Sequence, residues 1–317
     1  MPADRMQLMH GGTRCRAPRS ANAMPTLPKN ERLYLRLDDD PLHGPEAGMP
    51  AGTLRAFPVA EPLRTHVAHI LLYRETLPEG REVLERVLPD GAVRLVFNLG
   101  DAPSAGESTG HAVEAIGASA APALVRLCRK MEGLSVTLRP GAAAALLGRP
   151  ASEIAGTAVH LDELWRGRGA ELLERIALQP DDASRVSVLC AALQRRLADG
   201  DGAVHAAAMR AAQLIATSGG RRPLREVAAA VGLGERRLQQ VFRQQVGLSP
   251  RAWSRLARLH ACVRALRLQR EPAWASLALD GGFYDQSHLI NEFQALCGLT
   301  PTEFLGRAIS GSSKTAD

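Results

Sequence analysis

The sequence LQQVFRQQVGLSP at residues 238–250 is repeated 51 residues later as LINEFQALCGLTP at residues 289–301. In each copy a leucine and a phenylalanine four positions apart fall on one face of a helix, and a glycine then ends that helix. The Ser-Pro or Thr-Pro that follows is typical of a helix start, with the hydroxyl residue as N-cap and the proline in the first turn. The chain therefore contains two copies of one helical module.

The residues in front of each copy repeat as well. Val227-Ala228 and Gly232 precede the first copy, and Leu277-Ala278 and Gly282 precede the second. The small alanine lets two helices cross closely, and the glycine permits the positive φ of a tight turn. A short helix, a glycine turn and an amphipathic helix form the pattern of a helix-turn-helix. One copy alone would fit an ordinary helical hairpin equally well, but the doubling favours a DNA reader.

A helix predicted from Arg251 to Gln269 separates the two copies. It is long enough to hold two recognition helices against successive major-groove segments, which lie about 34 Å apart on one face of DNA. Residues 203–309 resemble the DNA-binding domain of the AraC/XylS family of bacterial transcription regulators. The resemblance implies a sequence-specific DNA-binding transcription regulator without enzymatic activity. Its most specific residues are GFYDQSHL at 282–289, Phe293, Gly298-Leu299-Thr300-Pro301 and Phe304.

In that family the exposed face of the second helix of each motif reads base edges. Arginine can bond O6 and N7 of guanine, glutamine can bond N6 and N7 of adenine, and isoleucine can touch a thymine methyl. Asn291 departs from the family pattern, in which arginine is frequent at that position, so we expect the first copy to carry more of the specificity. The matching positions are Arg236, Gln239 and Gln240 in the first copy and Gln286, Ser287, Ile290 and Asn291 in the second.

Positive charge is concentrated in the repeated region. The chain has 39 Lys plus Arg and 33 Asp plus Glu, a net charge of +6. Residues 221–309 contain 13 Arg, no Lys and 7 acidic residues, and therefore carry the whole excess. A basic excess confined to such a domain is what binding to DNA phosphates requires. We expect phosphate contacts, which position the protein without reading sequence, from Arg221, Arg222, Arg225, Arg243, Arg251 and Arg255.

The first two thirds of the chain predict a different architecture. Strands followed by helices indicate an α+β class, with a β-rich amino-terminal domain before an all-α domain of two helix-turn-helix units joined by a long helix. We expect a disordered tail at 1–53, with Met24 as an alternative start, a sensor or dimerisation domain at 54–199, the DNA-binding domain at 203–309 and a tail at 310–317. The predicted strands are 67–73, 83–88, 93–99, 123–128 and 134–138, and the predicted helices are 142–147, 161–178, 183–198 and 203–217.

A second, weaker resemblance concerns residues 54–199. RVLPDG at 86–91 with LVFN at 95–98, and RPGAAA at 139–144 with LDELW at 161–165, are similar to an uncharacterised amino-terminal domain found fused to AraC-type DNA readers. The resemblance implies a β-rich sensor or dimerisation domain and does not identify its ligand.

Residue types that carry chemistry do not form a recognisable site. The motif GxGxxG and the P-loop are missing from the sequence, and its five cysteines form no CxxC pair. His66 and His69 fall on opposite faces of a strand, and Asp162 and Glu163 suit the positive end of a helix. We therefore expect no cofactor, no metal and no catalytic residue.

The expected partner is a double-stranded DNA operator, with RNA polymerase as the protein partner. A small-molecule effector and a second copy of the chain, as a homodimer, are further candidates. No apolar run approaches 18 residues and no signal peptide is evident, so we expect no membrane association and a cytoplasmic location. The effector, the operator, activation versus repression and the oligomeric state stay open.

Two rival functions follow from the same sequence. The first is a DNA-targeted enzyme, such as an alkyl-transfer repair protein, which would need an activated thiolate at Cys128 or Cys190. Basic residues lie near Cys128 in sequence, but no known motif surrounds it. The second is a protein-binding module that acts on polymerase without reading bases.

Overall fold

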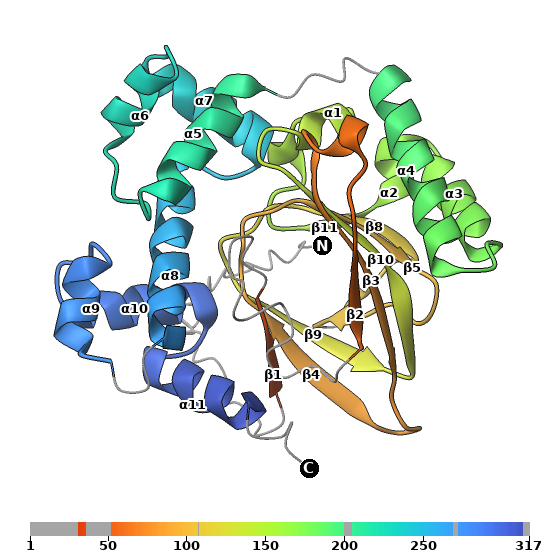
Figure 1. The fold of residues 1–317 in the computed structure, drawn as a ribbon, viewed down its shortest axis with the longest axis horizontal. Coiled ribbons are helices and arrows are strands. Elements are labelled where there is room, and N and C mark those ends of the chain that lie inside the picture. Colours follow the sequence, from red (N-terminus) through yellow and green to blue (C-terminus); the bar gives the residue numbers. More distant parts are fainter. Residues whose placement is uncertain (1–30, 36–51, 107, 200–204, 269–271, 313–317) are drawn as a thin grey trace, which may run out of the picture.

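The computed structural model describes residues 31–35, 52–106, 108–199, 205–268 and 272–312. Two sheets form the front domain, which we define as the sheets together with α1–α4 (Figure 1). One sheet has the strand order β1-β4-β9-β6-β7 and the other β11-β8-β5-β10-β3-β2. The strands are β1 Glu31–Tyr34, β2 Leu54–Phe57, β3 Val67–Thr76, β4 Glu82–Val87, β5 Arg94–Asn98, β6 Ser104–Ala105, β7 Ser108–Thr109, β8 Val113–Ile116, β9 Ala123–Cys128, β10 Lys130–Leu138 and β11 Ala158–His160.

Helices cover one side of the sheets and form the whole carboxyl-terminal half (Figure 1). The α+β class, with strands before helices, is therefore confirmed. The helices are α1 Ala143–Leu147, α2 Leu161–Trp165, α3 Arg168–Ala177, α4 Asp182–Asp199, α5 Ala206–Thr217, α6 Leu224–Ala230, α7 Glu235–Val246, α8 Pro250–Leu268, α9 Trp274–Asp280, α10 Gln286–Cys297 and α11 Pro301–Ser312, with 3₁₀ turns at Glu61–Leu63 and Ala151–Glu153.

The strands at the centre of the six-stranded sheet are among those expected from apolar runs. β10 pairs with β3 on one side and with β5 on the other, both antiparallel. Their inward side chains, such as Phe97, Leu134 and Val136, are fully buried and pack against α1 to α4. A cluster of charged groups ties α4 to this sheet, because Arg185 and Arg74 both donate to the Glu132 carboxylate at 2.9 Å.

The single helix expected at 161–178 is wrong, because two helices occupy this range. Arg166 and Gly167 both adopt positive φ, at 54° and 83°, and this ends α2 and turns the chain into α3. The carboxylate of Asp162 then accepts hydrogen bonds from the backbone N–H of Gly169, at 2.7 Å, and Ala170, at 3.0 Å. Asp162 therefore satisfies free N–H groups at the start of α3, which is not the helix whose start it was expected to stabilise.

The expected tails are also partly wrong. Residues 31–34 form β1, which pairs in parallel with β4, and the remainder of 1–53 lies outside the described residues apart from 35, 52 and 53. At the other end α11 runs to Ser312, so residues 310–312 are helical. Short strands such as β8 and β11 were missed as well. Such short segments are strands because they pair with neighbouring strands, and their local sequence pattern does not predict this.

The carboxyl-terminal half is built as two similar units joined by α8 (Figure 1). α5 to α7 pack around Leu238 and Phe242 in one core, and α9 to α11 pack around Leu289 and Phe293 in another. The 19 residues of α8 give a length of about 28 Å. The glycine that ends each second helix, Gly247 in the first unit, has positive φ as expected.

The front domain contacts both units directly. Leu33 of β1 and Leu88, just after β4, belong to the core of the second unit. His260 of α8 bonds to the carbonyl oxygen of Pro89 at 2.9 Å. Gly91 lies so close to the Trp253 ring of α8 that an added Cβ would be 2.6 Å away. In the part of the chain that is described, no helix is long and apolar enough to cross a membrane.

Candidate nucleic-acid interface

The second helix of each unit presents a polar face to solvent. α7 buries Leu238 and Phe242 and α10 buries Leu289 and Phe293, so the opposite side of each helix is outward. Six of the seven predicted base-reading side chains are exposed, and Ile290 is half-buried. The exposed six are Arg236, Gln239, Gln240, Gln286, Ser287 and Asn291.

The two recognition helices begin differently. Asp285 caps α10, since its carboxylate accepts from the backbone N–H of His288 at 2.7 Å, whereas Gly234 gives α7 no side-chain cap. His288 in turn accepts from the backbone N–H of Tyr284 at 3.2 Å and packs edge-on against Phe283. His288 therefore shapes the turn before α10.

The structure separates the six predicted phosphate-contacting arginines into two groups. Arg225, Arg243 and Arg251 are exposed, and none of them forms an ion pair with another described residue. The other three are already engaged. Arg221 donates to the carbonyl oxygen of Asp280 at 3.0 Å, Arg222 lies 3.8 Å from Glu226, and Arg255 donates to Glu292 at 2.7 Å.

A cleft between α8 and α10 collects several of these charges. Its volume is about 470 Å³, and Arg251, Arg255 and Arg258 line it together with Glu292. Burial lowers the pKa of Arg258, whose guanidinium donates to the carbonyl oxygen of Gly220 at 3.3 Å. The cleft is therefore basic overall, but Glu292 neutralises part of it.

Two exposed residues at or beside the recognition helices α7 and α10 were not predicted from the sequence. Arg237 is exposed beside Arg236 and donates to the side-chain oxygen of Gln240 at 3.0 Å. Tyr284 is 86% exposed immediately before α10. Tyr284 belongs to the most recognisable stretch of the chain but was not among the predicted base-reading residues, and its exposure distinguishes it from the buried Phe283 next to it.

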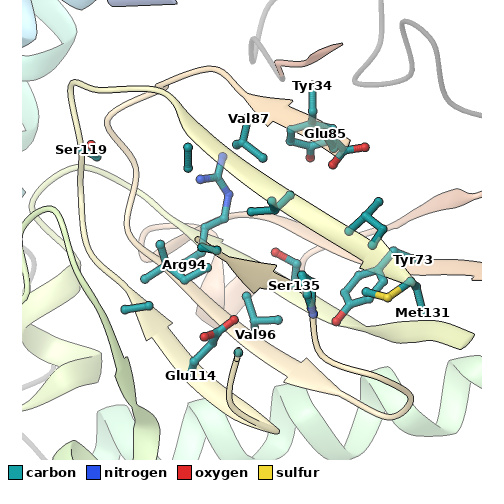
Figure 2. Close-up of a pocket in the computed structure, with 18 of the residues that line it drawn as sticks. Tyr34, Tyr73, Glu85, Val87, Arg94, Val96, Glu114, Ser119, Met131 and Ser135 are labelled. Atoms are coloured by element: carbon teal, nitrogen blue, oxygen red, sulfur yellow. The ribbon is translucent and has the colours of Figure 1, made fainter. Parts of the chain in front are cut away.

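A second site lies inside the front domain, where the sequence indicated no chemistry. It is a cavity of about 510 Å³ between the two sheets. Figure 2 shows Tyr34, Glu85 and Val87 on one side of it and Arg94, Val96 and Glu114 on the other. These residues come from strands far apart in sequence, so no local sequence motif predicts the cavity.

The two carboxylates in the cavity are strongly desolvated. Glu85 and Glu114 are each 7% exposed, and burial raises the pKa of both. Burial also raises the pKa of Tyr73, whose hydroxyl donates to the side-chain oxygen of Asn98. Arg94 forms an ion pair with Asp90, so its charge is compensated within the protein.

One layer of backbone separates this cavity from the second helix-turn-helix unit. Tyr34 of β1 and Val87 of β4 line the cavity, while their neighbours Leu33 and Leu88 belong to the core of the second unit. This follows from the alternation of side chains along a strand. A ligand that moves β1 or β4 would therefore move residues packed in the DNA-binding half.

Two family models match separate parts of the chain. A helix-turn-helix domain matches residues 227–307, and a domain of unknown function (DUF6597) matches residues 55–160. A search of curated proteins gave no match. The first model covers both recognition helices, and the second covers most of the strands that enclose the cavity.

Several solved structures are similar to the chain at low identity. An AraC-type transcriptional regulator from Chromobacterium violaceum is 21% identical over 32% of this chain and 91% of its own, with a TM-score of 0.30. ToxT from Vibrio cholerae is 10% identical over 75% and 98%, with a TM-score of 0.41. The C-terminal domain of AraT, a response regulator from Geobacillus stearothermophilus, is 20% identical over 32% and 84%, with a TM-score of 0.30. These TM-scores lie below 0.5, so the assignment depends on the family models.

Proposed function

We propose that this chain is an AraC/XylS-type helix-turn-helix DNA-binding transcription regulator, whose two units read adjacent major-groove segments of one operator under the control of the front domain. The observation that carries the proposal is the doubled recognition helix with its polar face left exposed while the opposite face is buried. Specificity comes from base contacts by Arg236, Gln239 and Gln240 in the first unit and by Gln286, Ser287, Ile290 and Asn291 in the second.

The front domain acts as the sensor in this proposal. Its cavity of about 510 Å³ falls within the range of small-molecule sites, and the cavity wall is shared with the second unit. An effector that binds only one arrangement of β1 and β4 would shift the population of DNA-binding conformations. RNA polymerase, a homodimer and a cytoplasmic location belong to the same proposal.

The surroundings of Cys190, one of the two cysteines named for the rival repair-enzyme function, do not favour an activated thiolate. Burial raises the pKa of Cys190, Cys297 and Cys262, the last to about 12. Thiols with raised pKa stay protonated near neutral pH, whereas alkyl transfer requires a thiolate. The surroundings of these three cysteines therefore support packing roles.

Arg236 is expected to read a base in the first half-site. Arg236→Ala should weaken operator binding by about 1–3 kcal/mol and relax base preference in that half-site alone. The measurement is selection of bound duplexes from a random pool with the full chain, which should yield two half-sites about 10–10.5 bp apart. The matched control is Arg175→Ala, an exposed arginine of α3, which should leave the selected sequence unchanged. A pool that shows no sequence preference with the unaltered chain would contradict base reading and favour a module that acts without it.

Arg251 and Arg255 are expected to differ in their contribution to salt dependence. Arg251→Ala should reduce the slope of log affinity against log salt by about 1, because one phosphate contact is lost. Arg255→Ala should change the slope less, because Glu292 already neutralises that guanidinium. Gel shifts of the full chain between about 50 and 200 mM salt measure both slopes. Equal effects of the two variants would show that Arg255 leaves Glu292 for the phosphate on binding.

A further inference from the structure

We propose that the cavity of the front domain binds a hydrophobic amine, with its ammonium group at Glu114, its apolar body between the two sheets, and Glu85 as a second acceptor on the opposite wall. The inference rests on the sensor role proposed above and specifies the chemical class of the effector. It is carried by three features of the cavity: an apolar lining; two buried carboxylates, of which Glu114 has no arginine or lysine partner among the described residues and Glu85 has an oxygen that accepts no hydrogen bond; and two arginines whose charges are already compensated.

The walls provide the apolar surface. Val96, Leu71 and Ile116 come from the six-stranded sheet, and Val87 and Leu127 come from the other sheet. Such a surface releases about 25 cal/mol for each Å² of apolar area that a ligand buries. The body of the ligand should therefore be aryl or alkyl rather than sugar-like.

Glu114 provides the first carboxylate. It lies on β8, and the backbone N–H of His111 donates to it. Among the described residues, Glu114 forms no ion pair with an arginine or a lysine. A buried carboxylate without an arginine or lysine partner is unfavourable by several kcal/mol unless it is protonated, the nearby His111 carries a charge, or another cation is supplied. A ligand ammonium would supply that cation.

Glu85 provides the second carboxylate, from the opposite sheet (Figure 2). Arg32 directs both terminal nitrogens of its guanidinium to Glu75, at 2.9 and 2.8 Å. One of these nitrogens lies 3.3 Å from Oε2 of Glu85, but this buried oxygen accepts no hydrogen bond. One arginine therefore faces two carboxylates at this end of the cavity, and an unused acceptor remains for a donor in the ligand.

The two arginines in the cavity wall do not reverse this preference. Arg94 is paired with Asp90, and Arg74 is paired with Glu132 and Asp182, so an anionic ligand would have to replace an existing partner. Two tyrosines, Tyr34 and Tyr73, also line the space, and aromatic faces attract cations. The charges on the wall thus favour a cation over a carboxylate or a phosphate.

The test is calorimetric titration of the full chain with three probes of matched shape: 4-phenylbutylamine, 4-phenylbutan-1-ol and 4-phenylbutanoate. The amine should bind at least tenfold more tightly than the alcohol, and the acid most weakly. Glu114→Gln keeps the shape of the side chain and removes its charge, so it should weaken the amine at least tenfold and leave the alcohol unchanged. Glu174→Gln, an exposed carboxylate of α3, is the matched control and should change neither.

Three outcomes would overturn the proposal. They are equal affinities of amine and alcohol, no binding of any probe, and tighter binding of the acid that is lost in Arg94→Gln. Gel shifts on the selected operator separate this failure from failure of the sensor role. If the acid or the alcohol binds and changes operator affinity, the effector is not an amine but the sensor role of the front domain stands. If the amine binds but operator affinity does not change, the ligand class is supported and the sensor role of the front domain is contradicted.

Discussion

Replacing Arg86 with methionine is expected to lower the free energy of unfolding of the chain by about 3–5 kcal/mol. Arg86 is 1% exposed and forms an ion pair with Glu31, whose side chain is fully buried. The change would leave the Glu31 carboxylate in a buried site without this guanidinium. Because this pair joins β1 to β4, the loss should also loosen the wall between the cavity and the second unit. Denaturant unfolding of the full chain measures the effect.

Two further variants separate the buried pair from a general effect of losing a charge. Arg126→Met removes the exposed partner of Glu82 in the same sheet and should change stability by about 0–1 kcal/mol. Adding Glu31→Met to Arg86→Met should recover much of the loss, because an apolar pair needs no charge compensation. If the double variant is as unstable as the single one, the loss comes from packing around Arg86 rather than from breaking its ion pair with Glu31.

The second large effect is expected at Phe293. Phe293→Ala should lower the free energy of unfolding by about 3–5 kcal/mol, because the ring is 1% exposed and its removal leaves a cavity in the core of the second unit. Its ring packs edge-on against Phe304 of α11 with centroids 5.5 Å apart, so the support of α10 is lost with it. Thermal or denaturant unfolding gives the stability change, and footprinting of the operator should show that the second half-site loses protection first.

Tyr284→Ala is the matched control, because it removes an aromatic ring from the same unit. Tyr284 is 86% exposed, and its removal should change stability by less than about 0.5 kcal/mol. A stability loss at Tyr284 comparable to that at Phe293 would contradict the description of this core. Reduced operator affinity of Tyr284→Ala at unchanged stability would instead add Tyr284 to the DNA-contacting surface.

The DNA-binding half could be predicted in detail because its signals are local. Leu238 and Phe242, four residues apart, predicted one buried helix face, and both are buried. Ser249 and Thr300 predicted helix starts, and each hydroxyl accepts a backbone hydrogen bond three residues later. The continuous helix at 161–178 was wrong, since two positive φ angles interrupt an otherwise helical pattern.

Long-range pairing explains what was missed in the front domain. β1 lies in a stretch rich in charge and proline, and it is a strand because it pairs with β4, more than 50 residues away. The cavity was missed for the same reason, since Glu85 and Glu114 belong to different sheets. Neither residue has a sequence neighbour that would indicate a site.

By itself, then, the sequence determined the module, its duplication, the helix ends and the polar face of each recognition helix. These depend on periodicity and caps within a few residues, which any helix of this composition would follow. Only the tertiary structure decided which arginines keep a free charge, because Arg255 is neutralised by Glu292 from another helix. It also decided that the segments carrying Tyr34 and Val87 in the cavity wall contribute Leu33 and Leu88 to the core of the second unit. Both results depend on which distant residues meet, and local sequence carries no record of that.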